Sequence, residues 1–219
     1  VYCDLSQLPL SLRTYAVATS MVTQTFVPRP NRVIISTFHY DRTKANYSHV
    51  ELVESMIRSS VEKLQPSNEG FLLAYLRPSV SETVLRCLKE LDVRVRAYGA
   101  TEGEIQSQCA ELENFEFFPL SPDFVKDLAA CDRIISTAGN QLLGEARFYN
   151  KPILAIPEPM QYEQSINSWY VEQTGMGQQC FLTDLSPQII EDFMSYKTLT
   201  HSEMNNGIHK VKQIIESYL

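Results

Sequence analysis

The sequence predicts an α/β fold, a doubly wound parallel sheet with helices on both faces. Six short apolar segments, rich in β-branched and aromatic residues, alternate with segments whose apolar residues recur at helical spacing. Glycine, proline and serine residues stand where strands end and helices begin. Strands that alternate with helices in this way are joined by right-handed crossovers, so the expected sheet is parallel and Rossmann-like.

The first forty residues predict only one helix and one strand. Apolar residues from Leu12 to Val22 recur at helical spacing, and Val33 to Phe38 has the composition of a buried strand. Two such elements cannot bury a core alone. We therefore expect residues 1–50 to be the end of an N-terminal domain with its linker, and residues 51–219 to be a C-terminal domain. Because the chain opens with Val1 rather than Met, we expect a fragment.

The elements of the main sheet follow from Gly70 in regular order, after a polar loop and a mixed segment. The predicted strands span residues 71–76, 93–97, 115–118, 133–136, 153–156 and 180–182. The predicted helices cover residues 104–112, 140–149, 163–173 and 208–218, and three more begin at Ser81, Ser121 and Ser186. A serine hydroxyl at such a position accepts a hydrogen bond from a free helix N–H group. The proline after Ser121 and after Ser186 suits the first helical position.

Composition and charge exclude several classes of protein. The net charge of −7 and the pI near 5.2 argue against a nucleic-acid partner, because phosphates require a basic face. No apolar run reaches the roughly 20 residues of a membrane span, although peripheral association with a membrane stays open. The five cysteines have no metal-ligand spacing and no signal peptide precedes them, so we expect reduced thiols, a cytoplasmic location and no metal. The motifs of zinc proteases, α/β-hydrolases, P-loop enzymes and nicotinamide dehydrogenases are absent.

The turn after the predicted strand 133–136 is a candidate anion site. Gly139 and Asn140 follow that strand directly and open a helix, whose free N–H groups and dipole suit a phosphate. A turn that needs a residue tolerant of positive φ explains Gly139 better when it is taken alone. Glu145 follows one and a half helical turns later. It is placed either to accept the hydroxyls of a ribose or to be a surface acid near the helix dipole.

Polar residues after other strands belong to the same expected edge of the sheet, where ligands of parallel sheets gather. Glu163 and Gln164, with Asn167 on the same helix face, suit sugar hydroxyls, or else ordinary helix N-terminal chemistry. The turn Pro119-Leu120-Ser121 offers backbone groups to the edge of a base, although a capped turn explains it equally. Arg77 is placed to neutralise a phosphate, or is simply solvated. The four histidines carry no signal, and no catalytic residue is identified.

Taken together, four motifs resemble a known pattern. They are Ser136-Thr137-Ala138-Gly139, Gly144-Glu145, the segment KPILAIP at residues 151–157, and Gln164-Ser165-Ile166-Asn167. In this serial order they resemble the donor-binding half of GT-B glycosyltransferases, in particular the group of the peptidoglycan N-acetylglucosaminyltransferase and related predicted glycosyltransferases. The resemblance is specific over residues 117–177 and looser over 70–117. It implies an enzyme that binds a nucleoside-diphosphate sugar, with a UDP-sugar favoured, and transfers the sugar to an unknown acceptor without a metal or cofactor.

The resemblance also implies a role for each candidate residue. The loop and helix start Thr137-Ala138-Gly139-Asn140-Gln141 would face the diphosphate, and Glu145 would bind the ribose hydroxyls. Gln164 with Glu163 would contact the donor sugar, and the turn 119–121 would meet the uracil through its backbone. The last helix would cross back to the N-terminal domain, which would supply the catalytic base. Two departures stand out: Leu76-Arg77-Pro78-Ser79 replaces the usual glycines, and no basic residue or histidine precedes Gln164.

Two alternatives remain open beside the transferase. One is a nucleotide-sugar hydrolase or epimerase on the same fold, in which water replaces the acceptor alcohol. The other is a non-catalytic interaction domain, which the acidic charge and the missing glycines near Arg77 favour. The transferase interpretation requires that Glu145 and the peptide N–H groups around Asn140 face an open cleft.

Overall fold

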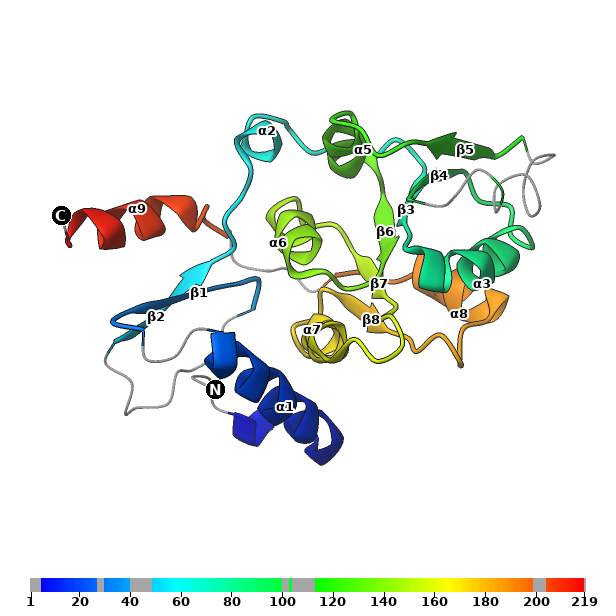
Figure 1. Ribbon diagram of the computed structural model, residues 1–219. Helices are drawn as coiled ribbons and strands as arrows, with labels where there is room; N and C mark the ends of the chain where they lie inside the picture. The colour runs from blue at the N-terminus through cyan, green and yellow to red at the C-terminus, as the bar shows by residue number, and fades with distance from the viewer. Residues whose placement is uncertain are drawn as a thin grey trace.

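The computed structural model describes residues 5–26, 30–39, 49–99, 103, 113–198 and 204–218. Its centre is a six-stranded parallel sheet with the strand order β5-β4-β3-β6-β7-β8 (Figure 1). The strands are β3 (Leu72–Tyr75), β4 (Val95–Tyr98), β5 (Phe115–Phe118), β6 (Arg133–Ser136), β7 (Ile153–Ala155) and β8 (Gly177–Gln179). This arrangement confirms the predicted α/β class with a parallel sheet.

Helices cover both faces of this sheet (Figure 1). One face carries α5 (Phe124–Ala130), α6 (Asn140–Phe148) and α7 (Tyr162–Gln173), and the other carries α3 (Pro78–Leu88) and α8 (Pro187–Met194). Neighbouring residues of one strand therefore enter different cores: Leu73 joins the apolar cluster below α5, α6 and α7, whereas Leu72 joins the cluster below α3 and α8. Strands that are buried on both faces read as continuous apolar runs, which is why composition revealed them.

The chain builds the sheet outward from its middle in two directions. It runs from β3 to β4 and β5, then returns to the opposite side of β3 for β6, β7 and β8. β3 and β6 are therefore neighbours, with Leu72 paired with Arg133 and Tyr75 with Ser136. Where the strand order reverses in this way, the connections leave in opposite directions and a ligand crevice forms at the carboxyl ends.

The N-terminal residues form a second, smaller layer. β1 (Val33–Thr37) pairs in parallel with β2 (Val50–Glu54), and the predicted boundary at residue 50 falls on the first residue of β2. We did not predict β2, because two glutamates among its five residues obscure its alternation. α1 (Leu10–Phe26), which follows a short 3-10 helix (Leu5–Gln7), packs on α7, and the rings of Tyr15 and Tyr162 stack with centroids 4.4 Å apart.

The C-terminal helix α9 (Ile208–Glu216) lies beside this smaller layer, near β1 and β2 (Figure 1). The Gly207 N–H donates to the Ser55 carbonyl at 3.0 Å, and the Arg32 guanidinium lies 5.1 Å from the centroid of the Tyr218 ring. The buried apolar residue of α9 is Ile214, whereas Ile215 and Tyr218 of the predicted stripe are about half exposed. The return of this helix toward the N-terminal residues is what the resemblance implies.

Three predicted boundaries are wrong. The last strand covers 177–179 rather than 180–182, since Gly177 lets two strands approach closely: a Cβ there would lie 1.8 Å from the Ile153 carbonyl oxygen. α3 begins at Pro78, after Arg77, so Ser81 lies inside the helix and donates to the Pro78 carbonyl at 3.3 Å. α5 begins at Phe124, after Asp123, rather than after Ser121.

Other expectations on local structure fare differently. The cap at Ser186 is confirmed, because its hydroxyl accepts a hydrogen bond from the Ile189 N–H. The predicted helix 104–112 lies outside the described residues.

Cys87, Cys131 and Cys180 are free and buried, and burial raises the pKa of the Cys131 and Cys180 thiols to about 12 and about 11. Of the helices that the structure describes, none has the length and apolar character needed to cross a membrane.

Candidate functional site

A cleft of about 640 Å³ opens at the carboxyl edge of the sheet, between the end of β3 and the start of α6. Its volume lies in the range of roughly 300–1,000 Å³ that is usual for small-molecule sites. Eight of the predicted residues line it: Arg77, Leu120, Ser121, Gly139, Asn140, Gln141, Glu145 and Glu163. The connections after β3, β5, β6 and β7 thus meet in one place, as parallel strands require.

The loop between β6 and α6 forms one wall of the cleft, and its strained residue is not the glycine. Ala138 has φ 60°, whereas Gly139 has an ordinary φ of −68°, so the expectation that Gly139 answers a need for positive φ is wrong. A left-handed alanine costs about 1–2 kcal/mol. The buried Asn167 side chain donates to the Ala138 carbonyl at 3.0 Å and stabilises this conformation.

Gly139 leaves open space beside the first turn of α6. Apart from Gly139 and its two chain neighbours, no heavy atom of the described residues lies within 4 Å of the position that a Cβ would take at Gly139. No described side chain caps α6, and the first N–H groups of an α-helix have no partner within the helix. A ligand can therefore approach the backbone closely, and the positive end of the helix dipole favours an anion there.

Glu145 lies at the floor of the cleft, and it is already paired. Arg58 Nε donates to Oε1 and Arg58 Nη2 donates to Oε2, both at 2.6 Å, and the Gln141 side chain donates to Oε1 at 2.8 Å. The Glu145 side chain is only 1% exposed, whereas the Arg58 side chain above it is 48% exposed. The hydrogen bond to Glu145 raises the pKa of Arg58. Glu145 lines the cleft, as the transferase interpretation requires, but the Arg58 side chain covers its carboxylate in this structure.

Arg58 comes from the segment that joins the small layer to the main sheet, and α6 holds that segment in place. Gln141 donates to the Met56 carbonyl at 3.1 Å, and the Ile57 N–H donates to the Asn206 side chain at 2.9 Å. Gly144 permits the close contact, because a Cβ at Gly144 would lie 2.3 Å from Ser55 Oγ. The backbone that carries Arg58 is therefore fixed against the helix that carries Glu145.

Gln164 has a different place from the one expected for a sugar contact. Its amide oxygen accepts from the Glu158 N–H at 2.8 Å, and its amide nitrogen donates to the Glu158 carboxylate at 2.9 Å. Ser79 donates to the other oxygen of Glu158 at 2.5 Å. Burial raises the pKa of Glu158, but the hydrogen bonds from Ser79 and Gln164 outweigh that effect and lower it overall. Gln164 thus braces the turn after β7, whereas Glu163 lines the cleft.

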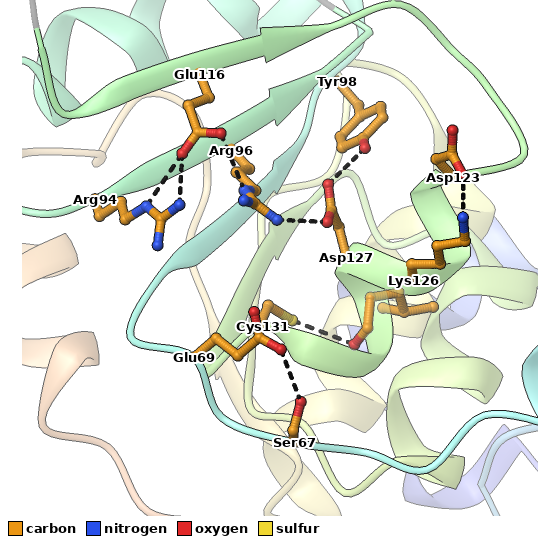
Figure 2. Close-up of polar contacts among 11 residues, drawn as sticks. Ser67, Glu69, Arg94, Arg96, Tyr98, Glu116, Asp123, Lys126, Asp127 and Cys131 are labelled. Carbon is orange, nitrogen blue, oxygen red and sulfur yellow. Dashed lines mark hydrogen bonds and ion pairs between the residues drawn. The ribbon is translucent and has the colours of Figure 1, made fainter.

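The wall after β5 is held by charged and aromatic contacts to α5. Asp127 of α5 accepts from Arg96 Nη1 at 2.7 Å and from the Tyr98 hydroxyl at 2.6 Å, as Figure 2 shows. Burial and the bond to Asp127 both raise the pKa of Tyr98. The Tyr98 ring also meets the Phe124 ring edge-on, with centroids 5.1 Å apart. Because Phe124 and Ser121 line the cleft, these contacts fix the position of its wall.

The sequence profile of glycosyl transferase family 1 matches residues 1–197. The chain belongs to this family. Its fold also resembles the glycotransferase of kitacinnamycin, with a TM-score of 0.65 and 13% identity over 98% of this chain and 64% of that one. MurG of Acinetobacter baumannii has a TM-score of 0.57 and 16% identity over 89% of this chain and 69% of that one. LpCGTa, solved in complex with UDP, has a TM-score of 0.50 and 15% identity over 76% of this chain and 46% of that one.

These findings confirm the GT-B resemblance and the fold class. This glycosyl transferase chain spans less than two thirds of the length of the kitacinnamycin protein, 64% of that chain. No curated protein matches the sequence. No group of three or more His, Cys, Asp or Glu residues in the described part of the chain is placed to hold a metal ion.

Four predicted residues of the glycosyl transferase lie outside the cleft lining. Thr137 and Ala138 are buried within the loop, Gln164 is bound to Glu158, and Pro119 is exposed beside the lining residue Leu120. Sequence reasoning missed four residues of the lining, of which three carry an aromatic or aliphatic side chain (Tyr75, Phe124 and Leu142) and one, Arg58, carries a charge. Arg58 is a lone arginine 87 residues before its partner Glu145, and no local pattern signals the contact.

A smaller chamber of about 210 Å³ adjoins the cleft, and Asn140 and Glu163 line both. Its other side is formed by Ser36 and Thr37 at the end of β1 and by His39, which follows that strand. Burial, with a smaller contribution from Arg147, lowers the pKa of His39 to about 4, so His39 is neutral at pH 7. The chamber thus combines hydroxyl, amide, imidazole and carboxylate groups between the two layers of the molecule.

Proposed function

We propose that this chain is the donor-binding part of a glycosyltransferase that uses a nucleoside-diphosphate sugar, with UDP-sugars preferred. Residues 1–50 would be the end of the N-terminal, acceptor-binding domain with its linker, and residues 51–219 the nucleotide-sugar domain. The family membership supports transfer of a sugar. UDP is favoured because LpCGTa, a structural neighbour, binds it.

The open, uncapped start of α6 is the observation that carries this proposal. It faces a cleft large enough for a nucleotide sugar, at the point where the strand order reverses. The diphosphate would lie at the N–H groups around Asn140, the ribose beside Glu145, and the base along the wall of Leu120 and Ser121. The sugar would then extend toward Glu163 and the smaller chamber.

In the proposed reaction, an acceptor oxygen bonds to C1 of the sugar while the bond from C1 to the diphosphate oxygen breaks. The acceptor loses its proton to a base, which we place in the N-terminal domain. The departing diphosphate gains negative charge. The positive end of α6 and the Arg77 guanidinium, which line the cleft, would stabilise this charge without a metal ion.

Thermal unfolding in the presence of nucleotides tests the proposal. UDP at 100 times its Kd should stabilise the chain by about 2.7 kcal/mol. We expect Glu145→Ala to abolish the shift, and Glu82→Ala, which removes an exposed acid of α3, to retain it. If neither UDP nor any other nucleoside diphosphate or nucleotide sugar shifts the midpoint at millimolar concentration, the proposal is wrong.

One structural observation favours the non-catalytic alternative. Arg58 covers the carboxylate of Glu145, and a domain that had lost its ligand would have no need to uncover it. Such a domain should bind no member of a panel of nucleotide sugars. A hydrolase or epimerase on this fold should bind them, and incubation of the full-length protein with UDP-sugars in the absence of acceptor should then release free sugar or change the sugar.

A further inference from the structure

Arg58 occupies the carboxylate of Glu145. A carboxylate has two oxygens with about four lone-pair sites. Arg58 uses both oxygens in a bidentate pair, and Gln141 adds a third hydrogen bond to Oε1. The neighbouring hydroxyls of a ribose would need the same two oxygens. With its side chain 1% exposed, Glu145 cannot accept them while Arg58 remains in place.

Arg58 can leave without moving its backbone. The chain before Arg58 is tied down, because Gln141 donates to the Met56 carbonyl and the Asn206 side chain binds both the N–H and the carbonyl of Ile57. The chain after Arg58 is tied down by the Tyr149 hydroxyl, which donates to the Val61 carbonyl at 2.6 Å. The Arg58 side chain is itself half exposed and lines the cleft. A rotation of this side chain would uncover Glu145 and carry the guanidinium into the cleft.

Charge decides which ligands can drive that rotation. Of the described residues that line the cleft, Arg58 and Arg77 are cationic, and Glu145 and Glu163 are anionic. A guanidinium that leaves a bidentate carboxylate loses strong, charge-assisted hydrogen bonds. A diphosphate can accept two hydrogen bonds from the same guanidinium fork in return. A nucleoside without phosphates offers Arg58 no anionic group to replace the carboxylate.

We propose that the ribose and Arg58 compete for Glu145, and that the diphosphate of the incoming nucleotide releases Glu145 by binding Arg58. This inference rests on the proposed function and adds a residue to it. Arg58 becomes a specificity-determining residue. It keeps nucleosides out of the site and admits nucleoside diphosphates, because only the latter supply both partners of the exchange.

Titration calorimetry with uridine and with UDP separates the two parts of the exchange. Arg58→Gln should bind uridine about tenfold more tightly than wild type and UDP about tenfold more weakly, since roughly 1.4 kcal/mol corresponds to each tenfold change. The ratio of the two dissociation constants should therefore fall about a hundredfold. Arg77→Gln is the matched control, because it removes a cation of the same cleft that does not touch Glu145. The Arg77→Gln variant should bind UDP more weakly than wild type and uridine as tightly as wild type.

Arg58→Lys guards against a variant that fails to fold. Lysine keeps the charge but cannot form the bidentate pair, so the uridine-to-UDP ratio should fall in the same direction by a smaller factor. Thermal unfolding of each variant without ligand verifies the fold. If wild type binds UDP but the ratio is unchanged in the Arg58 variants, the exchange is wrong and the proposed function stands. If wild type binds neither UDP nor any other nucleoside diphosphate or nucleotide sugar, both are wrong.

Discussion

Replacing Gly144 with alanine tests how closely α6 is packed against the segment that carries Arg58. A Cβ at Gly144 would lie 2.3 Å from Ser55 Oγ and 2.4 Å from Ser55 Cβ. Both distances are far below the roughly 3.5–4.0 Å of a favourable contact, so Ser55 has to move. Overpacking of this kind costs about 1–3 kcal/mol. The better helix propensity of alanine returns about 1 kcal/mol. We expect the free energy of unfolding to fall by about 0–2 kcal/mol.

Ser55→Gly supplies the compensating change. It removes both clashing atoms, and the next atom, Ser55 Cα, lies at 3.9 Å. The Ser55 hydroxyl is buried and has no hydrogen-bond partner among the described residues, so its loss breaks no hydrogen bond. In this background Gly144→Ala should stabilise the chain by about 1 kcal/mol.

Urea unfolding of the wild type, the two single variants and the double variant measures the coupling, with Trp169, the single tryptophan, as the fluorescent probe. The close contact predicts a coupling energy of about 1–3 kcal/mol between the two positions. Additive effects, within about 0.5 kcal/mol, would refute the packing of α6 against the Arg58 segment.

Three further predictions concern the loop after β6, the Asn167 side chain that binds this loop, and His39, which follows β1. Gly139→Ala should cost less than about 1 kcal/mol of stability, because its φ is ordinary and its surroundings are open, yet weaken UDP binding in calorimetry, because the methyl group enters the cleft. Asn167→Ala should cost about 1–3 kcal/mol in urea unfolding, since it removes the donor to the strained Ala138 and leaves that buried carbonyl unpaired, and UDP affinity should fall with it. The free energy of unfolding should decrease as the pH falls from about 6.5 to about 4, because unfolded His39 binds a proton in this window and folded His39, with its lowered pKa, does not. A pH series of urea melts on His39→Phe should lack that part of the decrease; an unchanged profile would show that His39 is not the group responsible.

Most strands of the main sheet can be predicted from the sequence, because burial on both faces gives them a recognisable composition. Strands such as β6 and β7 are buried on both faces, so they appear as apolar runs bounded by turn residues. β2 cannot be predicted from the sequence, because charged residues interrupt its apolar pattern. Its pairing with β1 is a contact between two segments that share no sequence pattern. The misplaced last strand depends on the space at Gly177, which is a tertiary property that single-sequence patterns do not contain.

The candidate site divides in the same way. Residues at strand ends, such as Arg77 and Gly139, meet in the cleft because topology alone brings them together. Side-chain pairing cannot be deduced from spacing. The Gln164 side chain donates a hydrogen bond to Glu158. Glu145 accepts hydrogen bonds from Arg58, which lies 87 residues earlier in the sequence. The residue with positive φ is Ala138 rather than its glycine neighbour, because Asn167 holds the loop in that conformation.

The crystal structure of this chain, determined from crystals soaked with UDP, tests most directly the claim that the start of α6 binds the donor diphosphate. The account predicts diphosphate oxygens within hydrogen-bond distance of the peptide N–H groups at Asn140 and Gln141, ribose hydroxyls on Glu145, and Arg58 turned from Glu145 to the diphosphate. UDP bound away from the start of α6, or an empty cleft in crystals soaked at saturating UDP, would contradict it.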